Sequence, residues 1–217
     1  MGDGQMKRWL RWALLVGAVG LATPGVAQGV AITEGRDTAE FSVGGLTYEI
    51  SRNQNTANQL VGRFSLTSRP CPEFCIQPMI AARGVETLGE LEVIAFLEGP
   101  VSAGSGLLID TRAPDAFASG SIPGAVNVPR EVLSLDNAYI AQVLEALGGQ
   151  PNGSRFTFTN AMELTLYGNG PWADEATRAI RDLVSVGYPA ERLRYYRGGM
   201  QGWMSLGLTV ADTRSGG

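Results

Sequence analysis

The sequence has 217 residues, 44% of them hydrophobic and 18% charged, which suits one full domain and a small extra segment. Its formal net charge of −4 gives no general electrostatic attraction to nucleic acid or anionic lipid. There is no histidine, which excludes Ser-His-Asp triads, Cys-His dyads and histidine-liganded metal sites. Cys71 and Cys75 are too few for a Cys₄ zinc or iron–sulfur site within one chain. We therefore expect no resident metal or cofactor and no nucleic-acid partner.

Residues 1–27 have the three-part pattern of a secretory signal peptide. A basic stretch over 7–11 precedes an apolar run over 12–22, and small residues lead to a cleavage site after Ala27. The apolar run is shorter than the roughly 20 residues that span a bilayer, which argues against an uncleaved anchor. We expect a periplasmic or secreted protein with no membrane span after cleavage. Cleavage removes Lys7, the only lysine, and with it Schiff-base chemistry.

Residues 28–84 are expected to form a small β-rich extension that packs on the following domain. The segments 41–43 and 46–50 alternate apolar and polar residues, and Gly44-Gly45 lies between them. This pattern predicts a β-hairpin with a two-residue turn. A third strand is expected over residues 62–66.

From residue 85 to residue 210, short apolar segments alternate with helical patterns. Strands are expected at 107–110, 126–128, 164–167 and 193–196. A first helix is expected after a capping box over Thr87–Glu90, with Leu88, Leu91 and Ala95 on one face. A second is expected over 140–147 with Asp136 as its N-cap, and a third over 176–184, ended by Gly187. This alternation predicts an α/β domain over 85–210, with a mainly parallel sheet flanked by helices, and a flexible tail over 211–217.

Two glycine-rich strings frame this domain. The first contains Asp110-Thr-Arg112, Phe117 and Gly120-Ser-Ile-Pro-Gly-Ala-Val-Asn-Val-Pro129, and the second runs Tyr195-Tyr-Arg-Gly-Gly-Met-Gln-Gly-Trp203. In order and spacing they resemble the two signatures of the rhodanese family, which implies a rhodanese-like fold over 85–210. Their residue types favour structural roles. Pro123-Gly124 suits a tight turn, Asp110 and Arg112 can form an ion pair that stabilises the turn, and Gly198-Gly199 permits close approach of the backbone. The residues that carry the resemblance are Asp110, Arg112, Pro123, Gly124, Arg197, Gly198, Gly199 and Trp203.

The resemblance places the family's chemistry in the loop after the 164–167 strand. There a cysteine thiolate holds a sulfur atom as a persulfide, stabilised by backbone N–H groups and a helix N-terminus. Here the loop reads Gly168-Asn169-Gly170-Pro171-Trp172-Ala173, with no Ser, Thr, Cys or Lys to act as nucleophile.

Three further features depart from the family pattern. Pro171 removes one N–H donor, and Asp174 and Glu175 place carboxylates on the first helical turn, where they repel an anionic donor. Ser121 stands where the signature has a histidine. We therefore expect no ordinary rhodanese mechanism. The loop, with Trp172, is either a small binding pocket or a structural turn.

The segments 68–79 and 169–172 resemble an exported subgroup whose loop reads C-N-G-P-W-C, so Gly168 and Ala173 stand where that subgroup has cysteines. Four interpretations of Cys71 and Cys75 stay open. They are a structural disulfide, an exchangeable redox pair, a metal site shared with another chain, or free or persulfidated thiols.

We expect an exported rhodanese-like binding or accessory module whose partner is a protein or a small sulfur-containing or anionic ligand. The alternatives are a sulfur carrier or dithiol–disulfide redox protein that uses Cys71 and Cys75, and a true thiosulfate sulfurtransferase.

Overall fold

A computed structural model describes residues 29–212, so the predicted signal peptide and residues 213–217 lie outside the described residues. The centre is a parallel five-stranded sheet with the order β3-β9-β8-β4-β5. Its strands are β3 (Glu86–Leu88), β4 (Gly106–Asp110), β5 (Val126–Asn127), β8 (Glu163–Tyr167) and β9 (Leu193–Tyr196). The sheet and its helices confirm the predicted α/β fold.

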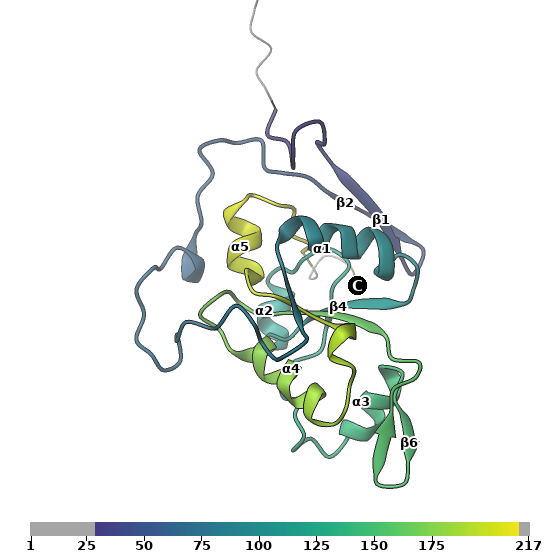
Figure 1. Ribbon diagram of the computed structural model, residues 1–217. Helices are drawn as coiled ribbons and strands as arrows, with labels where there is room; N and C mark the ends of the chain where they lie inside the picture. The colour runs from purple at the N-terminus through teal and green to yellow at the C-terminus, as the bar shows by residue number, and fades with distance from the viewer. Residues whose placement is uncertain (1–28, 213–217) are drawn as a thin grey trace, which may run out of the picture.

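Helices cover both faces of the sheet (Figure 1). They are α1 (Glu90–Phe96), which continues into the short π-helix η2 (Leu97–Val101), α2 (Pro114–Ala118), α3 (Ile140–Ala146), α4 (Glu175–Ser185) and α5 (Gly199–Ser205). Successive strand residues point to opposite faces. Leu108 and Tyr196 therefore pack with α1 and α5, whereas Ile109 and Tyr195 pack with α3 and α4. Within residues 29–212, no helix has the length and apolar character to cross a membrane.

The N-terminal hairpin forms as predicted. Strands β1 (Ala39–Val43) and β2 (Leu46–Ile50) pair antiparallel, and Gly44 and Gly45 both have positive φ, as a tight hairpin turn requires. Phe41 and Ile50 are buried in the core beneath α1. The hairpin therefore shares its hydrophobic core with the sheet.

The third predicted strand, over residues 62–66, is wrong. Gly62–Phe64 forms a 3₁₀ turn, η1, and the hydroxyl and N–H of Ser65 both donate to the Gly62 carbonyl. Gly62 has φ +59°, which starts a turn rather than a strand. The segment from β2 to β3 instead runs as a long loop along one flank of the sheet domain (left, slate blue in Figure 1).

Two predicted helix starts are also wrong. Thr87 pairs with β9 as part of β3, so α1 begins after Gly89, whose N–H donates to the carboxylate of Glu92. The buried face of α1 is Val93, Ile94 and Phe96, while the predicted Leu91 is 46% exposed and Ala95 is exposed.

Asp136 does not cap α3, because the N-cap position is Tyr139, whose N–H is bound by the side chain of Asn137. The sequence patterns also missed the hairpin of β6 (Gln150–Asn152) and β7 (Arg155–Thr157), and the turn η3 (Ala190–Arg192).

Candidate functional site

The N-terminus of α5 binds the backbone of the loop after β8. The N–H groups of Met200 and Gln201 donate to the carbonyls of Gly168 and Asn169, at 3.1 and 3.0 Å. Gly199 makes this close approach possible: it has φ +55°, and a Cβ built on it would lie 2.4 Å from the Gly168 carbonyl. One glycine of the second signature therefore fixes the position of the loop.

The inner side of the loop is occupied by a carboxylate. A Cβ built on Gly168 would lie 2.9 Å from Glu175 Oε2 and 3.7 Å from Thr111 Oγ1. Asn169 Nδ2 donates to Glu175 Oε1 at 2.9 Å, while no group within the described residues donates to the buried Oε2. Burial raises the pKa of the Glu175 carboxyl above its ordinary value. An anion bound at Gly168 would meet this carboxylate directly.

The two cysteines form a disulfide, with Cα atoms 4.7 Å apart. Of the four interpretations, the structure contains a disulfide and not free thiols. Cys71 is exposed and Cys75 is half-buried. The N–H of Gln77 donates to the carbonyl of Pro171 at 2.8 Å, which fastens the cysteine segment to the loop after β8.

A pocket of about 680 Å³ lies where these two segments meet. The disulfide and the side chains of Leu66, Arg69, Phe74, Ile76, Trp172 and Arg197 form most of its lining. The Phe74 and Trp172 rings have centroids 5.0 Å apart, and the Arg69 guanidinium carbon lies 4.6 and 4.7 Å from their centres. The pocket is therefore walled by aromatic faces with a cation against both.

Trp172 is held in one orientation from the α5 side. Its indole N–H donates to Gln201 Oε1 at 2.7 Å, and Gln201 Nε2 donates to the carbonyl of Phe64 at 3.0 Å. The guanidinium of Arg63 lies 5.7 Å from the Trp172 ring centre. Of the two readings of the loop, these contacts favour a pocket wall, because Trp172 faces the cysteine segment and is not packed into the sheet core.

Arg197, from the second signature, holds the same segment. Its Nε and Nη2 both donate to the carbonyl of Gln77, at 3.0 and 2.9 Å. The Gln77 side chain in turn accepts a hydrogen bond from the Thr177 hydroxyl of α4 at 3.2 Å. Gln77 therefore joins the extension to three parts of the domain: the loop, α4 and the residue after β9.

Asp110 and Arg112, both in the first signature string, form the expected ion pair and are buried. The nearby Pro123-Gly124 turn has a hydrogen bond from Ala125 N–H to the Ile122 carbonyl, and Gly124 has φ +76°.

Two other signature residues also serve packing. Trp203 is fully buried, and its indole N–H donates to the Thr209 carbonyl at 2.8 Å. A Cβ on Gly198 would lie 2.8 Å from the Tyr196 ring. These residues stabilise the fold and line no part of the pocket at the disulfide.

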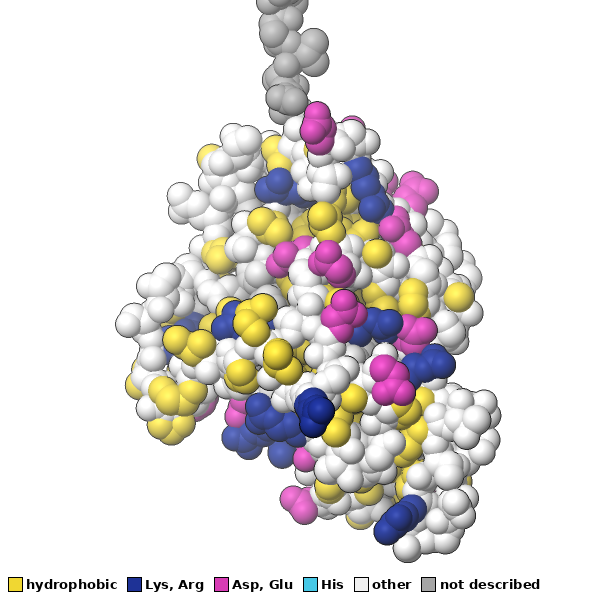
Figure 2. Space-filling view, viewed as in Figure 1, with side chains coloured by type: hydrophobic (Ala, Val, Ile, Leu, Met, Phe, Trp, Pro, Cys, Tyr) yellow, Lys and Arg dark blue, Asp and Glu magenta, His cyan; other side chains and the backbone are white. Residues whose placement is uncertain are grey.

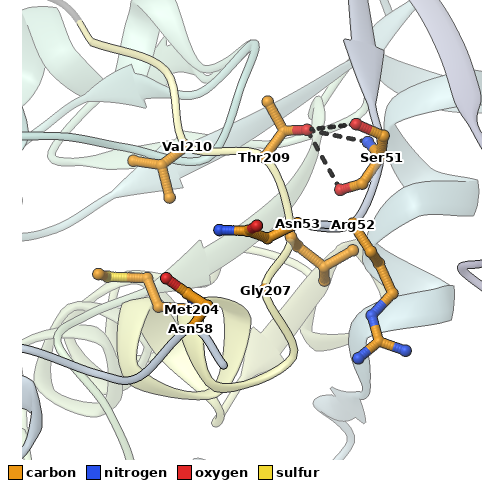
Figure 3. Close-up of a pocket in the computed structure, with 9 residues that line it drawn as sticks. Ser51, Arg52, Asn53, Asn58, Met204, Gly207, Thr209 and Val210 are labelled. Atoms are coloured by element: carbon orange, nitrogen blue, oxygen red, sulfur yellow. Dashed lines mark hydrogen bonds between the residues drawn. The ribbon is translucent and has the colours of Figure 1, made fainter. Parts of the chain in front are cut away.

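A second cavity, of about 370 Å³, lies where the segment after β2 meets the segment after α5 (Figure 3). The Thr209 hydroxyl accepts a hydrogen bond from the Ser51 N–H at 2.8 Å and donates one to the Ser51 carbonyl at 3.2 Å. The backbone N–H of Thr209 donates to the same carbonyl. Asn53, Asn58 and Met204 complete most of the wall. Ser51 and Thr209 pair across it, so this contact joins the two chain segments.

Among the described residues, no group of three or more His, Cys, Asp or Glu side chains is placed to hold a metal ion. A profile of the rhodanese-like domain matches residues 94–206. The chain belongs to the rhodanese-like domain family. The β-rich segment before α1 lies outside the match, as does the cysteine pair.

Solved structures similar to this rhodanese-like chain include sulfurtransferases. A thiosulfate sulfurtransferase from Pseudomonas aeruginosa is 22% identical, with a TM-score of 0.42, over 59% of this chain and 20% of that chain. A human single-domain sulfurtransferase is 22% identical, with a TM-score of 0.35, over 57% of this chain and 92% of that chain. A rhodanese-like domain from Anabaena is 16% identical, with a TM-score of 0.41, over 62% of this chain and 83% of that chain. A comparison with curated proteins found no match.

Sequence reasoning identified the loop and both cysteines but missed the residues that join them. Arg69 and Phe74 flank and separate the cysteines, so an arginine and an aromatic residue next to the pair were an available signal. Gln77 and Gln201 gave no signal, because their partners lie far away in the sequence. The backbone carbonyl of Gln77 accepts hydrogen bonds from Arg197, and the Gln201 side chain bonds to the Trp172 indole N–H and to the Phe64 carbonyl.

Proposed function

We propose that this chain is an exported rhodanese-like accessory protein that binds a ligand without ordinary thiosulfate sulfurtransferase activity. The observation that carries the proposal is the Glu175 carboxylate beside Gly168. Family chemistry needs a thiolate at this loop and donors that stabilise negative sulfur. Here the position has no side chain, and the space next to it holds a group of the wrong charge. The resemblance of segments 68–79 and 169–172 to an exported subgroup supports the location.

Thiosulfate-to-cyanide sulfur transfer tests the proposal. The mature chain, starting at Gln28, is expected to form no thiocyanate above the uncatalysed rate. It is also expected to gain no sulfur in intact mass after incubation with thiosulfate. Turnover by the wild-type chain that survives in Cys71→Ser/Cys75→Ser would overturn the proposal, since no thiol remains in that variant. A chain that stays in the cytoplasm, with residues 1–27 retained in its intact mass, would refute export.

Engineered variants test the stated reason. Gly168→Cys places a thiol against Glu175, whereas Gly168→Cys/Glu175→Ala also removes the carboxylate. The double variant is expected to take up one sulfur atom from thiosulfate at least tenfold faster than the single variant. Gly168→Cys/Asp174→Ala is the matched control, because it removes a neighbouring carboxylate that does not contact Gly168. Equal rates in all three variants would show that Glu175 is not the obstacle.

Thiol–disulfide exchange at the cysteine pair is the second candidate function. The exposed Cys71 on the pocket wall favours it. An incoming thiolate attacks Cys71 Sγ, forming a mixed disulfide and releasing Cys75 as a thiolate. A second thiol then resolves the mixed disulfide, so the partner is oxidised and the pair is reduced. Titration in glutathione buffers decides between the roles: a midpoint above about −300 mV supports exchange, and a lower midpoint a structural bond.

A further inference from the structure

Three arginines that form no salt bridge among the described residues gather around Trp172. Arg69 and Arg197 line the pocket at the disulfide, and Arg63 lies against the same indole ring. Within the described part of the chain, none of the three forms an ion pair, and no carboxylate lines this pocket. The whole chain has a net charge of −4, so a cationic pocket runs against its overall charge.

Arg69 has hydrogen-bond donors with nothing to bind. Its Nε and Nη2 are buried and have no acceptor among the described residues. The guanidinium instead lies against both the Phe74 and the Trp172 ring, whose centroids are 5.0 Å apart. A buried donor without an acceptor is costly, and natural structures leave few of them. The arrangement therefore indicates an anionic group that is supplied from outside the chain.

The shape of the pocket suits a small molecule. A volume of about 680 Å³ lies within the range of roughly 300–1,000 Å³ that is usual for small-molecule sites. The Trp172 and Phe74 rings line it, and the exposed side chains of Leu66 and Ile76 extend the apolar wall. Figure 2 shows hydrophobic and basic side chains interleaved on this flank, over the loop left of the sheet domain.

We propose that this pocket binds a small organic anion in which a flat aromatic ring carries a carboxylate. The ring stacks on Trp172, and the carboxylate accepts hydrogen bonds from Arg69, with Arg197 adding positive charge. The inference rests on the proposed function, because it names the ligand class of the binding module. Since Phe74 lies inside the five-residue disulfide loop, the Cys71–Cys75 bond holds one aromatic wall in place.

Binding of 2-naphthoate tests the inference, with 2-naphthamide as a neutral molecule of the same shape. Calorimetry on the mature chain is expected to show naphthoate binding at least tenfold more tightly than the amide. Arg69→Gln is expected to weaken naphthoate at least tenfold and leave the amide unchanged. Arg155→Gln is the matched control: Arg155 is exposed on β7, outside the pocket, and its replacement is expected to change neither affinity.

Other outcomes overturn the inference. Equal affinities for the acid and the amide would mean an apolar surface without an anion site. Inorganic sulfate binding as tightly as naphthoate would mean that the ring has no role. Unchanged binding in both Arg69→Gln and Trp172→Leu, with unfolding curves that match the wild type, would place the ligand elsewhere. None of these measurements uses thiosulfate, so failure here leaves the sulfurtransferase result intact, and the reverse holds as well.

Discussion

Replacing Asp110 with asparagine is expected to destabilise the domain strongly, because it leaves a buried charge without its counter-charge. The Asp110 and Arg112 side chains are 0% and 2% exposed. Arg112 Nε and Nη2 donate to the carboxylate at 2.9 and 2.5 Å, and the Arg112 backbone N–H donates to Oδ1 at 3.0 Å. Burial by itself lowers the pKa of Arg112, but the hydrogen bonds and charge of Asp110 outweigh it and raise that pKa. The guanidinium therefore stays charged at every practical pH.

The size of the loss follows from what the variant leaves behind. Asp110→Asn keeps the shape and one acceptor oxygen but removes the charge, and the Gly120 carbonyl, 2.8 Å from Nη2, carries none to replace it. Breaking a buried pair in this way costs about 3–5 kcal/mol, a large part of the roughly 5–15 kcal/mol that stabilises a domain. Asp110→Leu/Arg112→Met removes both charges, so it is expected to lose far less, about 1 kcal/mol.

Urea unfolding followed by tryptophan fluorescence measures these differences, since Trp203 is fully buried. Arg178→Gln is the matched control, because it breaks an exposed pair with Asp174 and is expected to cost under about 1 kcal/mol. A loss below about 1 kcal/mol in Asp110→Asn, or a double variant less stable than Asp110→Asn, would refute the buried-charge reasoning.

Two further predictions concern the loop after β8. Burial raises the pKa of Glu175, so the folded state is increasingly disfavoured as pH rises through the interval from the ordinary value, about 4.3, to the raised one. Glu175→Gln is therefore expected to match the wild type below about pH 4 and to exceed its unfolding free energy at pH 7; a constant difference across pH would contradict this. Gly199→Ala is expected to cost about 1–3 kcal/mol beyond Gly153→Ala, measured by urea unfolding. Both glycines have positive φ, but only the Cβ at 199 meets backbone, 2.4 Å from the Gly168 carbonyl, so equal losses would refute the packing argument.

Local patterns predicted most of the sheet, and the exceptions have physical reasons. The strands β4, β8 and β9 are short apolar runs buried on both faces, which is the signal of a central parallel strand. β3 was missed because only Leu88 of its three residues is buried and Thr87–Glu90 also fits a capping box. Its strand character comes from pairing with β9, a contact between distant parts of the chain that no local pattern encodes.

The candidate site was predictable in its parts but not in its assembly. Gly168, Trp172 and the cysteines stand out by composition and by resemblance. Their juxtaposition depends on Gln77, which bonds to residues 100 and 120 positions away along the chain. Its partners are the Pro171 carbonyl, the Thr177 hydroxyl and the Arg197 guanidinium, and groups of these kinds have many possible partners in any sequence. Such contacts become visible only when the tertiary structure is known.

The same contacts give the proposed binding site its place beside the loop of a rhodanese-like domain that has no loop thiol. The Glu175 carboxylate lies beside Gly168, and in the proposed function it keeps an anion out of the interior of the loop. The extension then lies on the outer side, fastened by Gln77 to Pro171 and to Arg197. That contact brings the two cysteine sulfur atoms and the unpaired Arg69 to the pocket that Trp172 lines. The signature arginine thus holds a segment that lies outside the matched domain, and the binding that we propose takes place at the surface between loop and extension.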